Sequence, residues 1–181
     1  MLFRRGKPLS LWRKIINFIW PQIGFKRAGK YIYLRILRIK DNPKGVAKGL
    51  ALGIAISITP FVGFHLILIG ILCWILRGNF LAGVLSSLLG NPITFPFIWY
   101  ATYLLGVTIL PISTGSVDLS PLPLFEMFGY FVKSVWTLNL SLFIEKVWPV
   151  WFPMLIGSIP LFIISFVLVY TTSLKILRRN R

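Results

Sequence analysis

The sequence predicts an all-α integral membrane protein, because of its composition and three long apolar stretches. Of its 181 residues, 56% are hydrophobic and 13% are charged, and the mean hydropathy is +0.80, whereas about a quarter of the residues of soluble proteins are charged. Residues 49–76, 78–117 and 147–174 contain no Asp, Glu, Lys or Arg. Since a helix needs about 20 apolar residues to cross a bilayer, each stretch is long enough to span it.

Basic residues gather at the two ends of the chain. The net charge is +16, and 13 of the 20 Lys and Arg residues precede Gly49 while four follow residue 174. Clustered basic residues also occur in nucleic-acid-binding proteins, but basic segments that flank apolar spans follow the positive-inside rule of membrane proteins. The pattern therefore predicts a multi-pass membrane protein with both termini in the cytoplasm, and it argues against nucleic acid as a partner.

Residues 1–42 form the first predicted region, which is basic and amphipathic. In a helix over residues 8–20, Arg13 and Lys14 share one polar side, while apolar and Trp residues cover the remainder. Such a helix is expected to lie at the membrane surface with its cations on anionic headgroups. The alternative is a helix packed on the protein's own apolar surface. A second piece, over residues 28–40, is expected along the same surface.

Residues 43–110 form the predicted membrane core. Asn42 suits the N-cap and Pro43 the first position of a helix. Small residues then recur at every fourth position on two opposite sides of this helix, and a later helix has a similar stripe. The three stripes are Gly45, Gly49 and Gly53; Ala47, Ala51 and Ala55; and Ala82, Ser86 and Gly90. Because small residues at this spacing let helices approach closely in lipid, the stripes predict tight helix packing.

The core contains two tandem helix units that are each broken by proline. Pro60, with Thr59 before it and Gly63 after it, interrupts the first unit, and Asn91-Pro92 interrupts the second. Proline removes a helical hydrogen bond and disfavours a helical conformation in the preceding residue. Each unit is therefore predicted to be a helix, a break and a second helix, and the first unit is either a kinked span or a re-entrant hairpin.

The positions of the charges favour the hairpin. If residues 49–76 turn back, Arg77 stays in the cytoplasm, residues 78–110 reach the far side, and the last span returns the basic tail to the cytoplasm. A kinked span would carry that tail outside. If residues 78–117 also formed a hairpin, residues 121–144 would have to supply a further span, a role that their amphipathic pattern fits poorly.

The rest of the chain is predicted to contain three parts. Residues 111–146 form a loop on the far side of the membrane with an interfacial helix, since the segment after residue 121 is amphipathic. Residues 147–174 form the C-terminal transmembrane helix, and Trp148 and Trp151 suit the headgroup level at its start. Residues 175–181 form a basic cytoplasmic tail.

Several motifs follow one another between Gly45 and Gly106: a small-residue helix, Pro-x-x-Gly-x-His, Arg-x-Asn and Asn-Pro-x-Thr. With this pattern the segment resembles the bacterial membrane family catalogued as domain of unknown function 2062, in its short stand-alone form. The resemblance covers about a third of the chain. It implies a protein of the bacterial inner membrane, and it implies no activity, because the family has no established biochemical function.

The candidate site consists of the polar groups and the breaks of the membrane core. These residues are Thr59, Pro60, Gly63, His65, Asn79, Asn91, Pro92 and Thr94. His65 is ionisable, and ionisable residues inside a membrane are costly and mark functional sites. The alternative is a neutral His65 bonded to a backbone carbonyl that Pro60 has freed. Basic residues expected to contact anionic lipid are Arg13, Lys14, Lys44, Lys48 and Arg77.

Paired broken helices predict a small transporter or flippase-like protein for an anionic lipid-like solute. Secondary transporters build their sites from such breaks, where helix N-termini attract anionic groups, and a homo-oligomer is one way for few helices to enclose a path. The alternative is a non-transporting membrane protein that binds anionic lipid or a partner protein through its basic amphipathic N-terminal region.

An enzyme is not expected. One His and no paired carboxylates in the core give no catalytic constellation. Neither a cofactor nor a metal site is predicted, since His65 and a distant Cys73 do not form a metal-ligand set.

Overall fold

The computed structural model describes residues 33–61, 63–88, 90, 94–110 and 122–179, and every structural statement below concerns these residues. Within them all regular structure is helical, which confirms the all-α prediction. The chain divides into two compact units, Met1–Ile39 and Lys40–Arg181. In the first unit residues 33–37 are helical, within the predicted second amphipathic piece, while the helix predicted over residues 8–20 lies outside the described residues.

Helices α3 (Pro43–Ser57) and α4 (His65–Leu76) form a hairpin. The Asn42 side chain caps α3 by accepting a hydrogen bond from the Lys44 backbone N–H at 2.9 Å, as predicted. The Lys48 ammonium donates to the Leu76 carbonyl at 2.9 Å. The end of α4 therefore lies next to the first turns of α3. A kinked span would place these two residues far apart, so the chain turns back between α3 and α4.

Helix α5 (Phe80–Ser87) lies beside α3 and runs in the same direction. The backbone N–H of Asn79 donates to the Gly45 carbonyl at 2.8 Å, and at the other end the Ser57 hydroxyl donates to the Ser87 carbonyl at 3.3 Å. Between these points a Cβ on Gly53 would overlap the Gly83 carbonyl. The glycine stripe of α3 therefore packs on the stripe of α5, as the small-residue pattern predicts.

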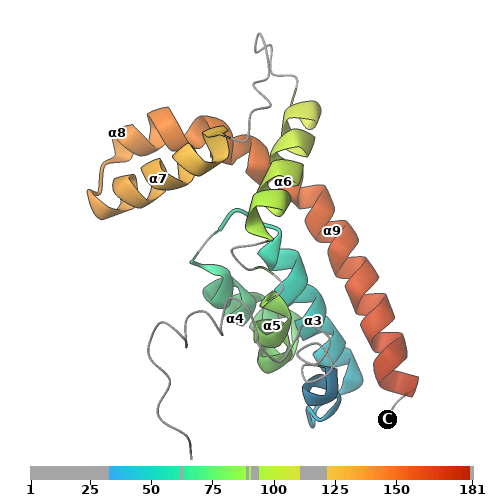
Figure 1. Ribbon diagram of the computed structural model, residues 1–181. Helices are drawn as coiled ribbons and strands as arrows, with labels where there is room; N and C mark the ends of the chain where they lie inside the picture. Colours follow the sequence, from blue (N-terminus) through green and yellow to red (C-terminus); the bar gives the residue numbers. More distant parts are fainter. Residues whose placement is uncertain (1–32, 62, 89, 91–93, 111–121, 180–181) are drawn as a thin grey trace, which may run out of the picture. The chain divides into compact units, whose positions relative to one another are not determined.

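The chain continues upward in Figure 1 through α6 (Phe95–Ile109) and returns through one long helix, α9 (Trp148–Arg179). Helices α7 (Leu122–Trp136) and α8 (Leu140–Leu142) and a π-helical turn, η1 (Phe143–Val147), lead into α9. Continuous helix over Leu140–Arg179 is long and apolar enough to cross a membrane, by length and composition, whereas α4 and α6 are shorter apolar helices.

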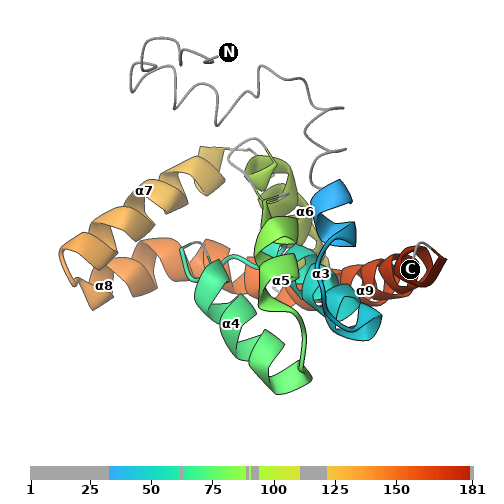
Figure 2. The same cartoon turned by 90° about the horizontal axis from the view of Figure 1, so that it is seen from below.

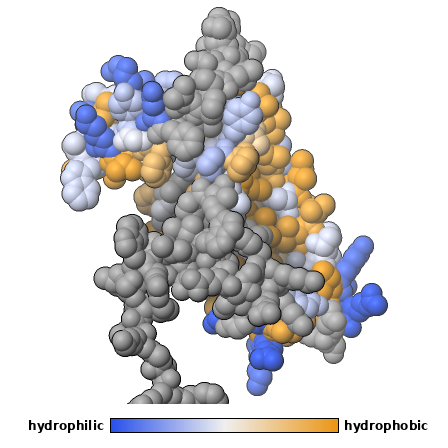
Figure 3. Space-filling view, viewed as in Figure 1, coloured by the Kyte–Doolittle hydropathy of each residue, from blue (hydrophilic) through white to orange (hydrophobic). Residues whose placement is uncertain are grey.

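Helix α9 packs on both α3 and α6. Leu52 and Ile56 of α3 belong to a buried cluster with Ile69 and Cys73 of α4, and Phe162 and Phe166 of α9 pack against it. The alanine stripe of α3 is fully buried. The exposed faces of α4 and α9 are apolar, with Trp74 exposed by 83% and Leu168 by 62%. Figure 3 shows this hydrophobic surface over α9, with hydrophilic side chains at its C-terminal end.

Candidate functional site

The two helix breaks lie next to each other. The first break separates α3 from α4 and the second separates α5 from α6. We call the described residues of the two breaks the break layer: residues 58–61, 63–64, 88, 90 and 94. Ser57, at the end of α3, contacts the second break at Gly90. The contact is so close that a Cβ added to Gly90 would lie 2.8 Å from the Cβ of Ser57. Residues that are about 30 positions apart in sequence thus meet at the ends of two parallel helices.

His65 and Phe95 are the first residues of α4 and α6, and their rings stack with centroids 5.9 Å apart and an angle of 18° between the planes. Two helix N-termini therefore converge at the histidine. The His65 Nε2 atom also lies 3.4 Å from the carbonyl oxygen of Thr59. The alternative interpretation expects a bond to a carbonyl that Pro60 has freed, which is that of Ile56, four residues earlier. The Thr59 side chain and backbone N–H satisfy the Ile56 carbonyl instead, so His65 contacts a different carbonyl of the same break.

The other polar groups of the first break take part in bonds within the break. The Thr59 hydroxyl donates to the Ile56 carbonyl at 2.7 Å, which satisfies an acceptor at the end of α3. Gly63 has a φ of +87°, a left-handed conformation that L side chains rarely adopt, so the turn requires a glycine there. These two residues shape the turn that brings His65 back toward α3.

Trp151 holds the first break against α9. Its indole Nε1–H donates to the Pro60 carbonyl at 3.2 Å, and its ring meets the Phe61 ring edge-on with centroids 5.5 Å apart. Sequence reasoning assigned Trp151 to the headgroup level and did not connect it with the break. The two residues of the hydrogen bond are 91 positions apart, and no local pattern indicates that they meet.

Asn79 lies away from the other predicted site residues. It is the N-cap of α5, where its side chain accepts from the Ala82 backbone N–H at 2.8 Å and donates to the Asp41 carboxylate at 2.7 Å. The eight residues of α5 separate it from the second break, about 12 Å along the helix. The structure therefore brings Thr59, Pro60, Gly63 and His65 together and leaves Asn79 at the opposite end of α5.

Two of the other predicted site residues, Asn91 and Pro92, lie outside the described residues, as do Arg13 and Lys14 among the predicted lipid contacts. Thr94 holds the N-cap position of α6, but its side chain makes no capping hydrogen bond.

Basic side chains gather where α3 and α5 begin and α4 and α9 end, a region that we call the basic end. Figure 2 shows α3, α4 and α5 from this side. Arg77 caps α4 in a left-handed conformation with φ +52° and is exposed. Lys48 donates to the carbonyl of Leu76, the last residue of α4, where a cation is favourable beside the helix dipole. The basic residues of this end are Lys40, Lys44, Lys48, Arg77, Lys175, Arg178 and Arg179.

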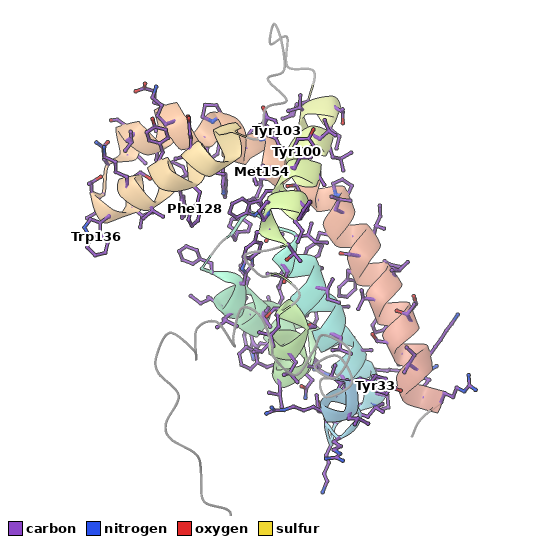
Figure 4. The ribbon with its side chains drawn as sticks, viewed as in Figure 1. Tyr33, Tyr100, Tyr103, Phe128, Trp136 and Met154 are labelled. Carbon is purple, nitrogen blue, oxygen red and sulfur yellow. The ribbon has the colours of Figure 1, made fainter. Side chains whose placement is uncertain are left out.

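A small cavity lies beside the first break, with room for about one water molecule. Its lining residues are Pro60, Trp99, Met127, Phe128, Phe131, Trp151 and Met154. Figure 4 labels Phe128 of α7 and Met154 of α9 in this wall. Trp99 is 8% exposed, and its buried Nε1–H has no hydrogen-bond partner among the described residues. An unpaired buried donor costs about 1–3 kcal/mol, and sequence reasoning did not single out Trp99.

The described helices define the class of the protein as all-helical, with one helix long and apolar enough to cross a membrane. Residues 26–181 match the family described as an uncharacterized protein conserved in bacteria, domain of unknown function 2062. The chain belongs to this family, as its motifs between Gly45 and Gly106 predict. No curated protein and no solved structure matches the chain.

Proposed function

We propose that the chain is a multi-pass protein of the bacterial inner membrane that binds an anionic lipid-like solute at its break layer and moves it across the bilayer. One observation carries the proposal: the stacked rings of His65 and Phe95 bring the N-termini of α4 and α6 to the single histidine. Helix N-termini present unpaired N–H groups and a positive dipole end, which favour a phosphate or carboxylate.

The exposed apolar surface supports the membrane placement. In water, the exposed apolar faces of α4 and α9 would be an aggregation risk, whereas in a bilayer acyl chains cover them. The α3–α4 hairpin keeps Arg77 and Lys44 on one side, and α9 returns Arg178 to that side. The positive-inside rule then assigns the basic end to the cytoplasm.

The basic end supports the choice of an anionic solute. Seven basic side chains lie there with one carboxylate, Asp41, while α7 and η1 at the other end of α9 carry Glu126 and Glu145 against Lys133 and Lys146. A cationic surface of this kind attracts anionic headgroups by about 1 kcal/mol per basic residue. It would concentrate an anionic lipid at this end of the protein.

A second candidate function is anionic lipid binding without transport, through the basic end and the basic residues of region 1–42. The hydrogen bonds of the first break favour it, because Thr59 and Pro60 already have partners within the protein and the break then serves a compact fold. Neither candidate includes catalysis or a metal, in keeping with the expectation from the single histidine and the lack of paired core carboxylates.

Reconstitution in vesicles separates the two candidates. We expect the full chain to exchange a fluorescent phosphatidylglycerol between leaflets faster than a zwitterionic lipid, and His65→Ala to slow this exchange by at least about tenfold, the loss expected for one hydrogen bond to a charged group. His65→Gln keeps a donor and should retain part of the rate. Thr108→Ala, at an exposed position of α6, is the control.

Two outcomes contradict transport. The transport proposal is overturned if lipid exchanges between the leaflets equally fast in empty and in protein-containing vesicles. It is also overturned if His65→Ala leaves the exchange rate unchanged. If lipid retained by the purified protein then falls on neutralising Lys44, Arg77 and Arg178 together, the second candidate stands. If retention also stays unchanged, both candidates fail.

A further inference from the structure

The cavity beside Pro60 is lined by Trp99, whose buried indole N–H has no hydrogen-bond partner among the described residues. Two indole rings line it, from Trp99 and Trp151. The Trp151 N–H is satisfied by the Pro60 carbonyl at 3.2 Å, while the Trp99 N–H has no partner among the residues described. Buried indole N–H groups in proteins usually have an acceptor. The Trp99 N–H therefore lacks an acceptor among the described residues.

The surroundings restrict what that acceptor can be. The other lining side chains are Met127, Phe128, Phe131 and Met154, which offer no strong acceptor, and the space fits about one oxygen atom. A free water needs two to four polar partners to be held in place, and the lining offers at most two, the Trp99 N–H and the Pro60 carbonyl that already accepts from Trp151. An oxygen atom that is attached to an apolar molecule needs only one partner, because the rest of the molecule can lie on apolar surface.

Helix α7 supplies such a surface next to the cavity. Phe128 of the cavity wall is 39% exposed, and Val132 and Val135 further along α7 are exposed by 50% and 56%. The amphipathic pattern of α7 predicts an interfacial helix, and that position would put the cavity near the depth where phospholipids carry their glycerol esters. An ester carbonyl is an acceptor attached to an acyl chain, the combination that this site requires.

We propose that the cavity receives the ester carbonyl oxygen of a membrane phospholipid, which accepts a hydrogen bond from the Trp99 indole N–H. The acyl chain then lies along the exposed apolar residues of α7. The cavity shares Pro60 with the break layer but does not include His65, and the proposal rests on the proposed function for the placement of the chain in a membrane.

The test compares ester-linked and ether-linked phosphatidylglycerol with equal chain lengths, since the ether lipid lacks the carbonyl. The full-length protein, labelled with nitrogen-15 at its indoles, is placed in lipid nanodiscs of each kind. We expect the Trp99 indole proton signal, identified by its loss in Trp99→Phe, to lie downfield in the ester lipid. The Trp151 signal, identified by Trp151→Phe, is the matched control and should be equal in both lipids, because its acceptor is Pro60.

A second readout needs no substitution. The chain has three methionines, and two of them line the cavity. Methyl-labelled Met127 and Met154 should show cross-peaks to the acyl protons next to the ester carbonyl. Equal Trp99 signals in the two lipids, or missing cross-peaks in the ester lipid, overturn the proposal and assign the space to water or to a void. If the protein enters the discs and gives these results, the cavity site alone is refuted. If the protein does not enter the discs, the membrane placement is refuted as well.

Discussion

Gly106 of α6 and Gly157 of α9 lie in direct backbone contact: a Cβ on Gly157 would be 2.5 Å from the Gly106 nitrogen. In the other direction, a Cβ on Gly106 would overlap the Pro153 carbonyl. Thr102, one turn before Gly106, is completely buried at the same crossing. Because neither glycine has room for a side chain, this contact fixes the distance between α6 and α9, and with it the position of the second break relative to the long helix.

Gly157→Ala is therefore expected to destabilise the protein. The added methyl group would overlap the backbone of α6, and overpacking of this kind costs about 1–3 kcal/mol. The measurement is the free energy of unfolding in mixed micelles, followed by circular dichroism. Gly70→Ala is the matched control, since its Cβ would lie 3.7 Å from the Phe80 ring and helix propensity favours alanine by up to about 1 kcal/mol. Equal stability of the two variants would contradict the crossing.

The glycine stripe of α3 offers a comparison within one helix. A Cβ on Gly53 would overlap the Gly83 carbonyl, whereas a Cβ on Gly45 would have its nearest neighbour at an ordinary 3.6 Å. We expect Gly53→Ala to cost about 1–3 kcal/mol and Gly45→Ala to be nearly neutral. Thermal unfolding of both variants in the same detergent measures the difference. If Gly45→Ala were the more harmful change, α3 and α5 would have a different register.

Local signals made part of this fold predictable. Asn42 and Pro43 predicted the start of α3, and the spacing of Gly49 and Gly53 predicted a close helix contact. The same spacing does not say which helix is the partner, because any stripe of small residues, including one on a second copy of the chain, would fit. The hairpin was favoured by the position of Arg77, an argument that depends on the sum of the charges rather than on a local motif.

The composition of the candidate site was harder to predict, since polar residues in an apolar run need not lie at the same depth. Asn79 was grouped with His65 on composition, but it caps α5 at the basic end. The N-cap role of Asn79 could have been predicted from the sequence, because an asparagine directly before an apolar helix is a common N-cap. Pairs such as Pro60–Trp151 and His65–Phe95 depend on the tertiary packing of separate helices and leave no pattern in a single sequence.

Asn79→Ala is expected to weaken the junction of α3, α4 and α5. The change removes the cap on the Ala82 N–H and the bond to Asp41, and loss of an N-cap costs about 0.5–2 kcal/mol. Asn79→Ser keeps a capping oxygen and should recover most of the stability. Unfolding in mixed micelles measures both variants. A serine variant as unstable as the alanine variant would mean that the Asp41 bond, not the cap, carries the effect.

Trp151→Phe tests the link between the first break and α9. Phenylalanine keeps an aromatic ring but has no donor for the Pro60 carbonyl, so we expect a loss of about 1–3 kcal/mol from an unsatisfied buried acceptor. Amide hydrogen exchange should rise in residues 58–64, because the break loses its attachment. The control is Trp136→Phe at the end of α7, where the side chain is 88% exposed. Unchanged exchange at the break would show that aromatic packing alone holds it.

The last prediction concerns the side of the membrane on which each helix end lies. In a Cys73→Ser background, single cysteines are introduced at four exposed positions: Lys44, Phe80, Leu138 and Arg178. Lys44, Phe80 and Arg178 share the basic end, and Leu138 is 90% exposed at the junction of α7 and α8. Phe80 is a better probe of this end than its neighbour Gly78, because a Cβ on Gly78 would lie 3.3 Å from the Gly49 nitrogen.

With an impermeant thiol reagent added to intact cells, we expect labelling at Leu138→Cys and protection of the other three until the membrane is opened. This pattern follows if the α3–α4 hairpin enters and leaves the membrane on the cytoplasmic side. Helices α5 and α6 together then cross the membrane outward, and α9 crosses it back. Labelling of Phe80→Cys from outside would make residues 49–76 a crossing segment. The basic tail would then face outward against the charge rule, and the break layer would no longer lie at the turn of a hairpin.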